Sequence, residues 1–297
     1  MGIGQSFMSR RDKSTHQKDR SKLRPKLMQT CQDYANTVNT KTSLYLFSGR
    51  KNKSSLFIYN TENDSEQTIN WETPELLSGI GISIAELPNG KLFCFGNYPA
   101  SGVTLIIDKD FKIQDLPSAA LIKFSSAIYF KKNVYCFGGE DFKDTKLSLS
   151  RRFSLNVNRW FELPRMPNAL YLCNCIIFDG NILISGALTR TLLLYSAYLN
   201  SFSVIPYEFS VNWRKILVNA ERRLYLIESM SGSIYESKIG SCMDWTRIAD
   251  STINFSPAQA YSLYNKGVIY IGCLDRYDAV YFKLKLRKKG SMALEKI

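Results

Sequence analysis

The chain has 297 residues, of which 45% are hydrophobic and 22% are charged. It is long and apolar enough to fold around a core, which excludes disorder of the whole chain. No apolar run approaches the roughly 18 residues that a membrane-spanning helix needs, so no such span is predicted. His16 is the one histidine, which excludes most zinc and copper sites and most histidine-based catalysis. We predict no catalytic residue, no metal site and no cofactor.

The net charge of +13 is concentrated at the two ends of the sequence. Residues 1–30 carry +6 and the last fifteen residues +5, which leaves +2 for residues 31–282. Two basic ends on a nearly neutral body indicate an anionic surface that the ends contact, either a membrane or nucleic acid. A solvated, solubilising tail is the alternative. Residues 1–30 are predicted to be a disordered tail, whose basic residues are Arg10, Arg11, Lys13, Lys18, Arg20, Lys22, Arg24 and Lys26.

Seven cysteines form an odd set, and no secretory signal segment precedes them. We therefore predict reduced thiols in a cytosolic protein. Cys173 and Cys175 form a Cys-x-Cys pair, but neither a second pair nor a nearby histidine completes a zinc site. Both are interpreted as packing residues.

The body of the chain repeats a short apolar strand that ends in small residues. Six copies occur, and the positions where the apolar run ends, here called anchor positions, are 48, 96, 138, 185, 228 and 272. Five of them hold a small residue, and the fifth copy has Glu228 followed by Ser229. Successive anchors are 48, 42, 47, 43 and 44 residues apart. A period this regular indicates a repeat architecture.

Each copy has the same internal order of strands and turns. An apolar strand and a turn precede the anchor strand, as in residues 125–130 followed by 131–133, which is typical of a hairpin. A loop and a third strand follow the anchor, and a fourth strand contains Trp71, Trp160 or Trp245 in three of the copies. Four strands in about 45 residues make one propeller blade. We predict an all-β, six-bladed propeller over residues 31–285, with residues 286–297 a basic tail or part of the last blade.

The repeats resemble the kelch family, most closely in the third copy. That copy has Tyr135, then Gly138 and Gly139 at its anchor, and Trp160 followed by Leu-Pro-Arg-Met-Pro at 163–167. The resemblance implies a kelch-like propeller, here standing alone, and a protein-binding role without enzymatic activity. Enzymes of the galactose-oxidase type belong to the same group, but their copper needs histidine ligands that this chain lacks.

By the same resemblance, a partner would bind the loops after the anchors and the starts of the first strands. The residues selected on this basis are Arg50, Lys51, Tyr98, Glu140, Arg151, Arg190, Arg276 and Tyr277, beside Lys53, Asn97, Asp141, Thr189 and Asp275. Arginine and tyrosine are the residue types that anchor interfaces, although solvated loops have a similar composition.

The first six residues, Met-Gly-Ile-Gly-Gln-Ser, fit the signal for N-myristoylation at Gly2. About one random sequence in a hundred matches this signal by chance. A myristoyl chain alone binds membranes only marginally and needs a second signal, which the basic residues of the tail supply. An unmodified tail is the alternative.

These observations leave three hypotheses. The first is an adaptor that recruits a protein partner to the cytosolic face of an anionic membrane. The second is a soluble propeller whose basic tails bind an acidic protein or, less favoured, nucleic acid. The third is an enzyme at the mouth of the propeller, which would need a carboxylate with a strongly shifted pKa in the central channel.

Overall fold

The computed structural model describes most of the chain from residue 42 onward. The described residues are 42–50, 53–71, 81–96, 102–118, 121–187, 189–205, 209, 214–220, 223–229, 231–238, 240–250, 260–275, 278–286 and 292–297. The chain divides into two compact units, Met1–Thr40 and Lys41–Ile297, and all described residues belong to the second. The predicted tail over residues 1–30 and the predicted start of the propeller at residue 31 therefore lie outside the described residues.

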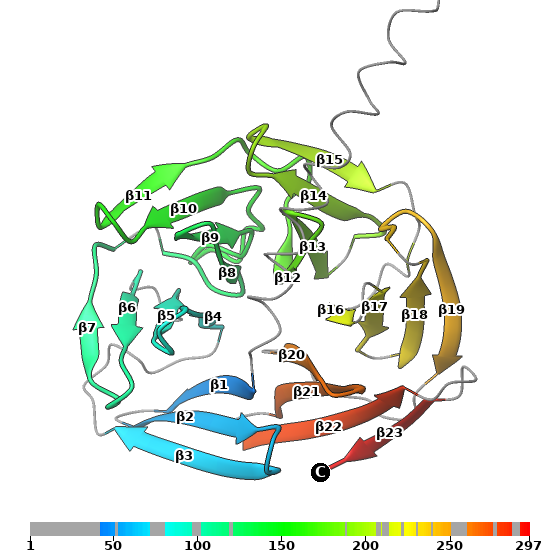
Figure 1. The fold of residues 1–297 in the computed structure, drawn as a ribbon. Helices are drawn as coiled ribbons and strands as arrows, with labels where there is room; N and C mark the ends of the chain where they lie inside the picture. The colour runs from blue at the N-terminus through cyan, green and yellow to red at the C-terminus, as the bar shows by residue number, and fades with distance from the viewer. Residues whose placement is uncertain are drawn as a thin grey trace, which may run out of the picture. The chain divides into compact units, whose positions relative to one another are not determined.

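The second unit is a ring of six antiparallel sheets, each made of consecutive strands (Figure 1). The strands of the first three blades are β1 (Ser43–Arg50), β2 (Lys53–Asn60) and β3 (Ser65–Trp71); β4 (Ser83–Glu86), β5 (Leu92–Phe95), β6 (Thr104–Ile107) and β7 (Ile113–Asp115); and β8 (Ser126–Phe130), β9 (Asn133–Phe137), β10 (Ser150–Ser154) and β11 (Arg159–Glu162). The prediction of an all-β, six-bladed propeller is confirmed.

The last three blades have four strands each. They are β12 (Tyr171–Phe178), β13 (Asn181–Ala187), β14 (Leu192–Ser196) and β15 (Ser201–Ile205); β16 (Lys215–Ala220), β17 (Arg223–Glu228), β18 (Ser233–Ser237) and β19 (Trp245–Asp250); and β20 (Ala260–Asn265), β21 (Val268–Asp275), β22 (Asp278–Leu286) and β23 (Met292–Lys296). The sequence left open whether residues 286–297 form a basic tail or part of the last blade. Residues 292–296 complete it as β23, the outermost strand, paired with β22.

The anchor positions lie in or directly after the second strand of each blade. In the first blade this second strand is β1. The five other blades each have one more strand, nearer the centre of the ring, and these innermost strands are β4, β8, β12, β16 and β20. The first blade therefore has three strands among the described residues. No helix of the described part of the chain is long and apolar enough to cross a membrane.

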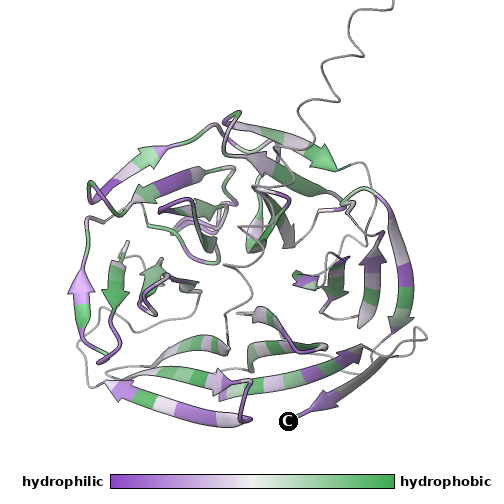
Figure 2. Ribbon diagram, in the orientation of Figure 1, coloured by the Kyte–Doolittle hydropathy of each residue, from purple (hydrophilic) through white to green (hydrophobic). Residues whose placement is uncertain are grey.

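The core consists of six apolar clusters among the described residues, and each one joins two neighbouring blades. Phe93 and Phe95 of the second blade, for example, lie 6.1 and 4.9 Å from the ring of Trp160 in the third. The apolar content needed for this packing is visible in Figure 2, where β13 is green while the outer strands β3 and β19 carry purple segments. Burial between blades, not within one blade, is what stabilises the ring.

The hairpins between the third and fourth strand positions of the first, third and fourth blades share one turn geometry. Their last residues have left-handed backbones, with φ near +50° at Asp64, Asn158 and Asn200. Asparagine and aspartate tolerate this conformation better than most residues. The hydroxyl of Tyr59 donates to Asp64 Oδ1 at 2.9 Å, and that of Tyr195 donates to Asn200 Oδ1 at 2.8 Å. A tyrosine five residues before the last residue of the turn thus holds it in two of the blades.

The ring closes where the sixth blade packs on the first. Tyr59 stacks on Tyr281 with ring centroids 4.6 Å apart. The ammonium of Lys283 lies 2.6 Å from Asp64 Oδ2 and lowers the pKa of that carboxyl. Asn265 Nδ2 donates to Thr61 Oγ1 at 2.9 Å. Closure among the described residues therefore depends on side chains of residues about 200 positions apart.

Replacement of Tyr59 by alanine should open this contact. Tyr59 is buried, and truncation of a buried aromatic side chain removes about 3–5 kcal/mol of unfolding free energy. Tyr198→Ala is the matched control, because Tyr198 is 89% exposed and should change stability by less than about 0.5 kcal/mol. Urea denaturation of both variants measures the difference. Equal stability of the two variants would contradict the closure described above.

Candidate functional site

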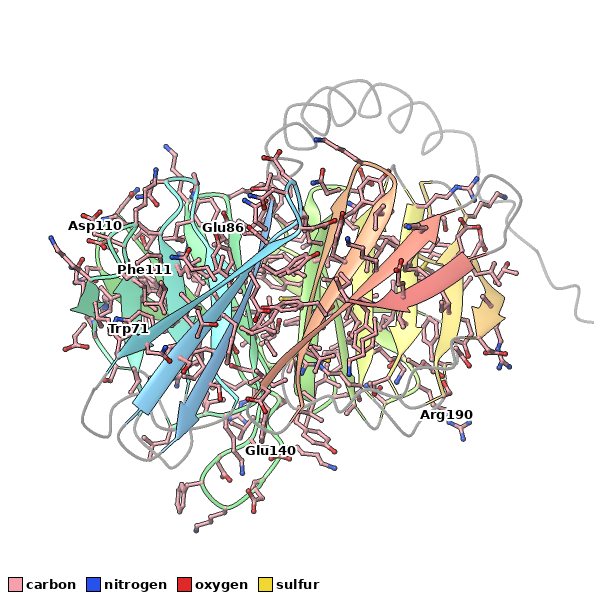
Figure 3. All side chains as sticks on the ribbon, turned by 90° about the horizontal axis from the view of Figure 1, so that it is seen from below. Trp71, Glu86, Asp110, Phe111, Glu140 and Arg190 are labelled. Atoms are coloured by element: carbon pink, nitrogen blue, oxygen red, sulfur yellow. The ribbon has the colours of Figure 1, made fainter. Side chains whose placement is uncertain are left out.

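The strand order gives the ring two different faces. First-to-second and third-to-fourth strand turns lie on one face, here called the hairpin face, represented by residues 131–132 and 155–158 of the third blade. Second-to-third connections, such as residues 138–149 and 189–191, lie on the other, here called the loop face. Figure 3 shows Glu140 and Arg190 on the loop face, and Glu86 and Asp110 toward the opposite side.

Three of the eight predicted partner-binding residues have described side chains. Glu140 and Arg190 lie on the loop face, well separated from each other (Figure 3). Arg151 forms an ion pair with Glu162 on the next strand of its own blade, at 2.7 Å. Arg50 is the last residue of β1, with its side chain outside the description, and Lys51, Tyr98, Arg276 and Tyr277 are outside it altogether. The described members do not form one cluster.

Residues 138–149, here called the blade-3 loop, form a well-bonded projection on the loop face (Figure 3). Lys123 and Glu140 exchange two backbone hydrogen bonds, of 3.0 and 2.8 Å. Asp141 Oδ1 accepts hydrogen bonds from the backbone N–H groups of Lys143 and Thr145, at 2.8 and 2.9 Å. These bonds define the course of the loop before any partner is present, which lowers the entropy lost on binding.

Phe142 stands at the tip of the blade-3 loop and is 57% exposed. The ammonium of Lys143 lies 5.3 Å from the centre of its ring. An exposed aromatic side chain on a rigid loop is a typical anchor of protein interfaces. Sequence reasoning selected the neighbouring Glu140 and Asp141 but missed Phe142. Most phenylalanines of this chain fall at strand positions, so the one that follows the Gly-Gly anchor was also assigned to packing.

The Gly-Gly anchor has a structural reason in this loop. Gly138 and Gly139 have φ of +63° and +107°. A Cβ on Gly138 would lie 2.5 Å from the carbonyl oxygen of Leu170, and one on Gly139 would lie 2.6 Å from that of Lys123. Only glycine fits both the backbone conformation and the close approach of the neighbouring chain.

Charged groups at the base of the loop neutralise each other. The ammonium of Lys123 lies 3.7 Å from Glu140 Oε2 and also contacts Asp144. Burial raises the pKa of Glu140, while Lys123 opposes the rise. Lys123 lies 17 residues before Glu140 in the sequence, on the connection into β8, so no local motif indicated the pair. The ion pair and the backbone hydrogen bonds of Glu140 thus help to hold the loop in place.

A second buried amine lies between the fourth and fifth blades. Lys215, the first residue of β16, is fully buried, and its Nζ donates to the carbonyl oxygen of Thr189 at 2.7 Å. Burial lowers the pKa of Lys215 to about 8, although the nearby carboxylate of Glu228 raises it. Thr189 was selected from the sequence, whereas Lys215 was not, because a lysine at the start of a strand resembles a solvated residue.

A small cavity lies on the central side of β1. Its volume is about 60 Å³, and it is lined by Ser43, Leu44, Tyr45, Ile84, Glu86, Tyr261, Ser262 and Leu263. Ligand pockets usually enclose several hundred Å³. Among the described residues, no group of three or more histidine, cysteine, aspartate or glutamate side chains is arranged to hold a metal ion.

The described cysteines are buried. Burial raises the pKa of Cys94 and of Cys173 to about 12. Both are therefore neutral thiols at physiological pH, and a thiol is a poor nucleophile and metal ligand compared with a thiolate. This agrees with their interpretation as packing residues.

Substitution of Gly139 by alanine should destabilise the protein more than the same change at Gly180. Both have positive φ, but a Cβ at Gly180 meets no atom within 4 Å, whereas one at Gly139 would lie 2.4 Å from Ile122 Cγ2. We expect Gly180→Ala to remove about 1 kcal/mol of unfolding free energy and Gly139→Ala at least about 2 kcal/mol more. Chemical denaturation compares them, and limited proteolysis should cut the blade-3 loop faster in Gly139→Ala only.

Lys215 should make stability rise with pH in the alkaline range. Its pKa is about 8 in the folded protein against an ordinary value of 10.5, so between these values the unfolded chain binds more protons than the folded one. The unfolding free energy gains on the order of 3 kcal/mol from this group as pH rises through the window. Lys215→Met should lack that gain. Denaturation of both proteins at pH 8 and above measures it, and parallel pH profiles would show that Lys215 titrates normally.

Comparison with known proteins gives the fold. No family model matches the sequence, and no curated protein matches it. Among solved structures, that of YjhT is similar, with a TM-score of 0.63, 10% identity, and coverage of 86% of this chain and 98% of that one. YjhT is a kelch-repeat propeller, and at this identity the likeness concerns the fold alone. The chain thus has the kelch-like six-bladed propeller fold that its repeats predict.

Proposed function

We propose that this protein is a non-enzymatic adaptor that binds a protein partner through the loop face of its propeller. The observation that supports this role best is Phe142, exposed at the tip of a loop whose backbone is fixed by its own hydrogen bonds. A preformed loop with an aromatic tip can bury that side chain in a partner's pocket with little loss of conformational entropy.

The surroundings of Phe142 extend the contact area. Leu121, which precedes the first strand of the same blade, is 38% exposed. The ammonium of Lys146 lies 5.0 Å from the centre of the Tyr171 ring, at the start of the fourth blade. Apolar and aromatic groups beside solvated charges have the composition of a binding site with a polar rim.

The proposal includes attachment to the cytosolic face of an anionic membrane. It rests on the signal at Gly2 and on the basic residues between Arg10 and Lys26, all of which lie outside the described residues. Lipid and basic cluster together would give stable attachment where either alone gives little. The adaptor would then bring its partner to the membrane.

Binding by Phe142 can be tested by affinity purification from the source cells with quantitative mass spectrometry. Phe142→Ala should lose specific partners retained by wild type and by Val204→Ala, which removes an exposed apolar side chain from β15, the outer strand of the fourth blade. An interface anchor contributes at least about 2 kcal/mol, which corresponds to about thirtyfold weaker binding. Identical partner profiles for all three proteins would contradict the proposal.

Attachment can be tested separately with Gly2→Ala. Wild type expressed in eukaryotic cells should gain the mass of a myristoyl group and sediment with membranes, whereas the variant should do neither. An unmodified, cytosolic wild type would remove the lipid from the proposal and leave the basic ends as a site for an acidic partner.

A further inference from the structure

The hairpin face of three consecutive blades carries exposed apolar side chains at its outermost turns. They are Val157 in the third blade, Tyr198 and Leu199 in the fourth, and Met243 in the fifth, with exposed fractions of 62%, 89%, 68% and 47%. All four lie in turns between a third and a fourth strand. They include the two most exposed large hydrophobic side chains of the described residues, Tyr198 and Leu199.

The geometry of these turns does not require apolar residues. The corresponding turn of the first blade carries Glu62, Asn63 and Asp64, and that of the second carries Lys109 and Asp110, all of them exposed. The turns of the first five blades each contain a residue with a left-handed backbone, namely Asp64, Phe111, Asn158, Asn200 and Gly240. The other positions of these turns differ between blades, so apolar residues in three adjacent blades call for another explanation.

Basic side chains surround these apolar tips. Exposed charged residues at the turns of the third to sixth blades on this face are five basic and two acidic among the described residues: Lys131, Lys132, Arg159, Lys238 and Lys266 against Asp179 and Asp244. The tips thus stand in a surface with an excess of three positive charges. The acidic turn residues of the first two blades lie elsewhere around the ring.

We propose that the tips Val157, Tyr198, Leu199 and Met243 insert into an anionic lipid bilayer, with the flanking lysines and arginine facing its headgroups. Separate convex turns on one face of a ring fit a planar, deformable surface, whereas a protein partner would need a matching pocket for each tip. Tyrosine is favoured at the interface between lipid and water, and basic residues near an anionic leaflet are attracted to its headgroups.

This inference deepens the proposed membrane attachment and gives it an orientation. With the hairpin face on the bilayer, the loop face and Phe142 point away from it, toward a soluble partner. The contact requires no lipid on Gly2, so it can be examined on unmodified protein, separately from the Gly2→Ala experiment.

The test uses full-length protein from bacteria, without lipid modification, and phosphatidylcholine vesicles with and without phosphatidylserine. Tyr198→Trp places a fluorescent probe at a tip, and Phe142→Trp places the same probe on the loop face as the matched control. On vesicles with phosphatidylserine, the added emission of Tyr198→Trp should shift to shorter wavelength and be quenched by brominated lipid, while that of Phe142→Trp should not change. A second pair, Tyr198→Ser with Leu199→Ser in one protein and Phe142→Ser in another, is compared by vesicle sedimentation.

We expect the double serine variant to bind these vesicles about tenfold more weakly than wild type, and Phe142→Ser to bind like wild type. Three results would overturn the inference: no binding of the unmodified protein, binding in which the basic tail acts alone and neither probe responds, or a response of Phe142→Trp only. A partner protein that shifts the emission of Tyr198→Trp in the absence of lipid would also overturn the inference. None of these results would affect the loss of partners expected for Phe142→Ala.

Discussion

Closure of the ring is the constraint on which the other features depend. Each blade is a small sheet that cannot bury both of its faces alone, and each apolar cluster of the described core is shared by two neighbours. The sixth blade must therefore meet the first, and it does so through Tyr59 on Tyr281 and Lys283 on Asp64. Because the described strands of these two blades come from opposite ends of the ring sequence, this contact ties the two ends together.

The closed ring fixes the positions of the loops. Lys123 reaches Glu140 because the connection into β8 passes the end of β9. Leu147 forms a β-bridge with Leu170, the residue just before the first strand of the fourth blade. The blade-3 loop is thus bonded to its surroundings at its base and exposes Phe142 at its tip. Rigidity near the ring and exposure away from it are the two properties that a binding loop on a propeller needs.

The two faces of the ring suggest a division of tasks in the proposed adaptor. Apolar tips with basic neighbours occupy the hairpin face, and the aromatic-tipped loop occupies the opposite face. Opposite faces of one rigid ring can contact a membrane and a partner at the same time without competition. This arrangement explains why a small propeller would keep exposed hydrophobic side chains on both sides.

The sequence was sufficient to predict the fold but only part of the site. The apolar strands and the regularly spaced small residues depend on neighbours in the sequence. The six repeats, and the fourth strand that contains Trp160, could therefore be predicted from the sequence. Arg151 was selected as a partner-binding residue because arginine often anchors interfaces, while its ion pair with Glu162 on the paired strand could not be predicted from the sequence. Lys215 and the Lys123–Glu140 pair were missed because only the closed ring brings their partners together. The exposure of Phe142 and Tyr198 depends on where each turn projects, which composition alone does not indicate.

Amide hydrogen exchange of the unmodified wild-type protein tests closure most directly. In a ring closed by the contacts around Tyr59, strands β2 and β22 should exchange as slowly as β9 and β13, because all four lie in blades packed on both sides. Exchange of β2 and β22 at rates far above those of β9 and β13 would contradict closure, since it would mean that the first and sixth blades open independently of the middle of the ring.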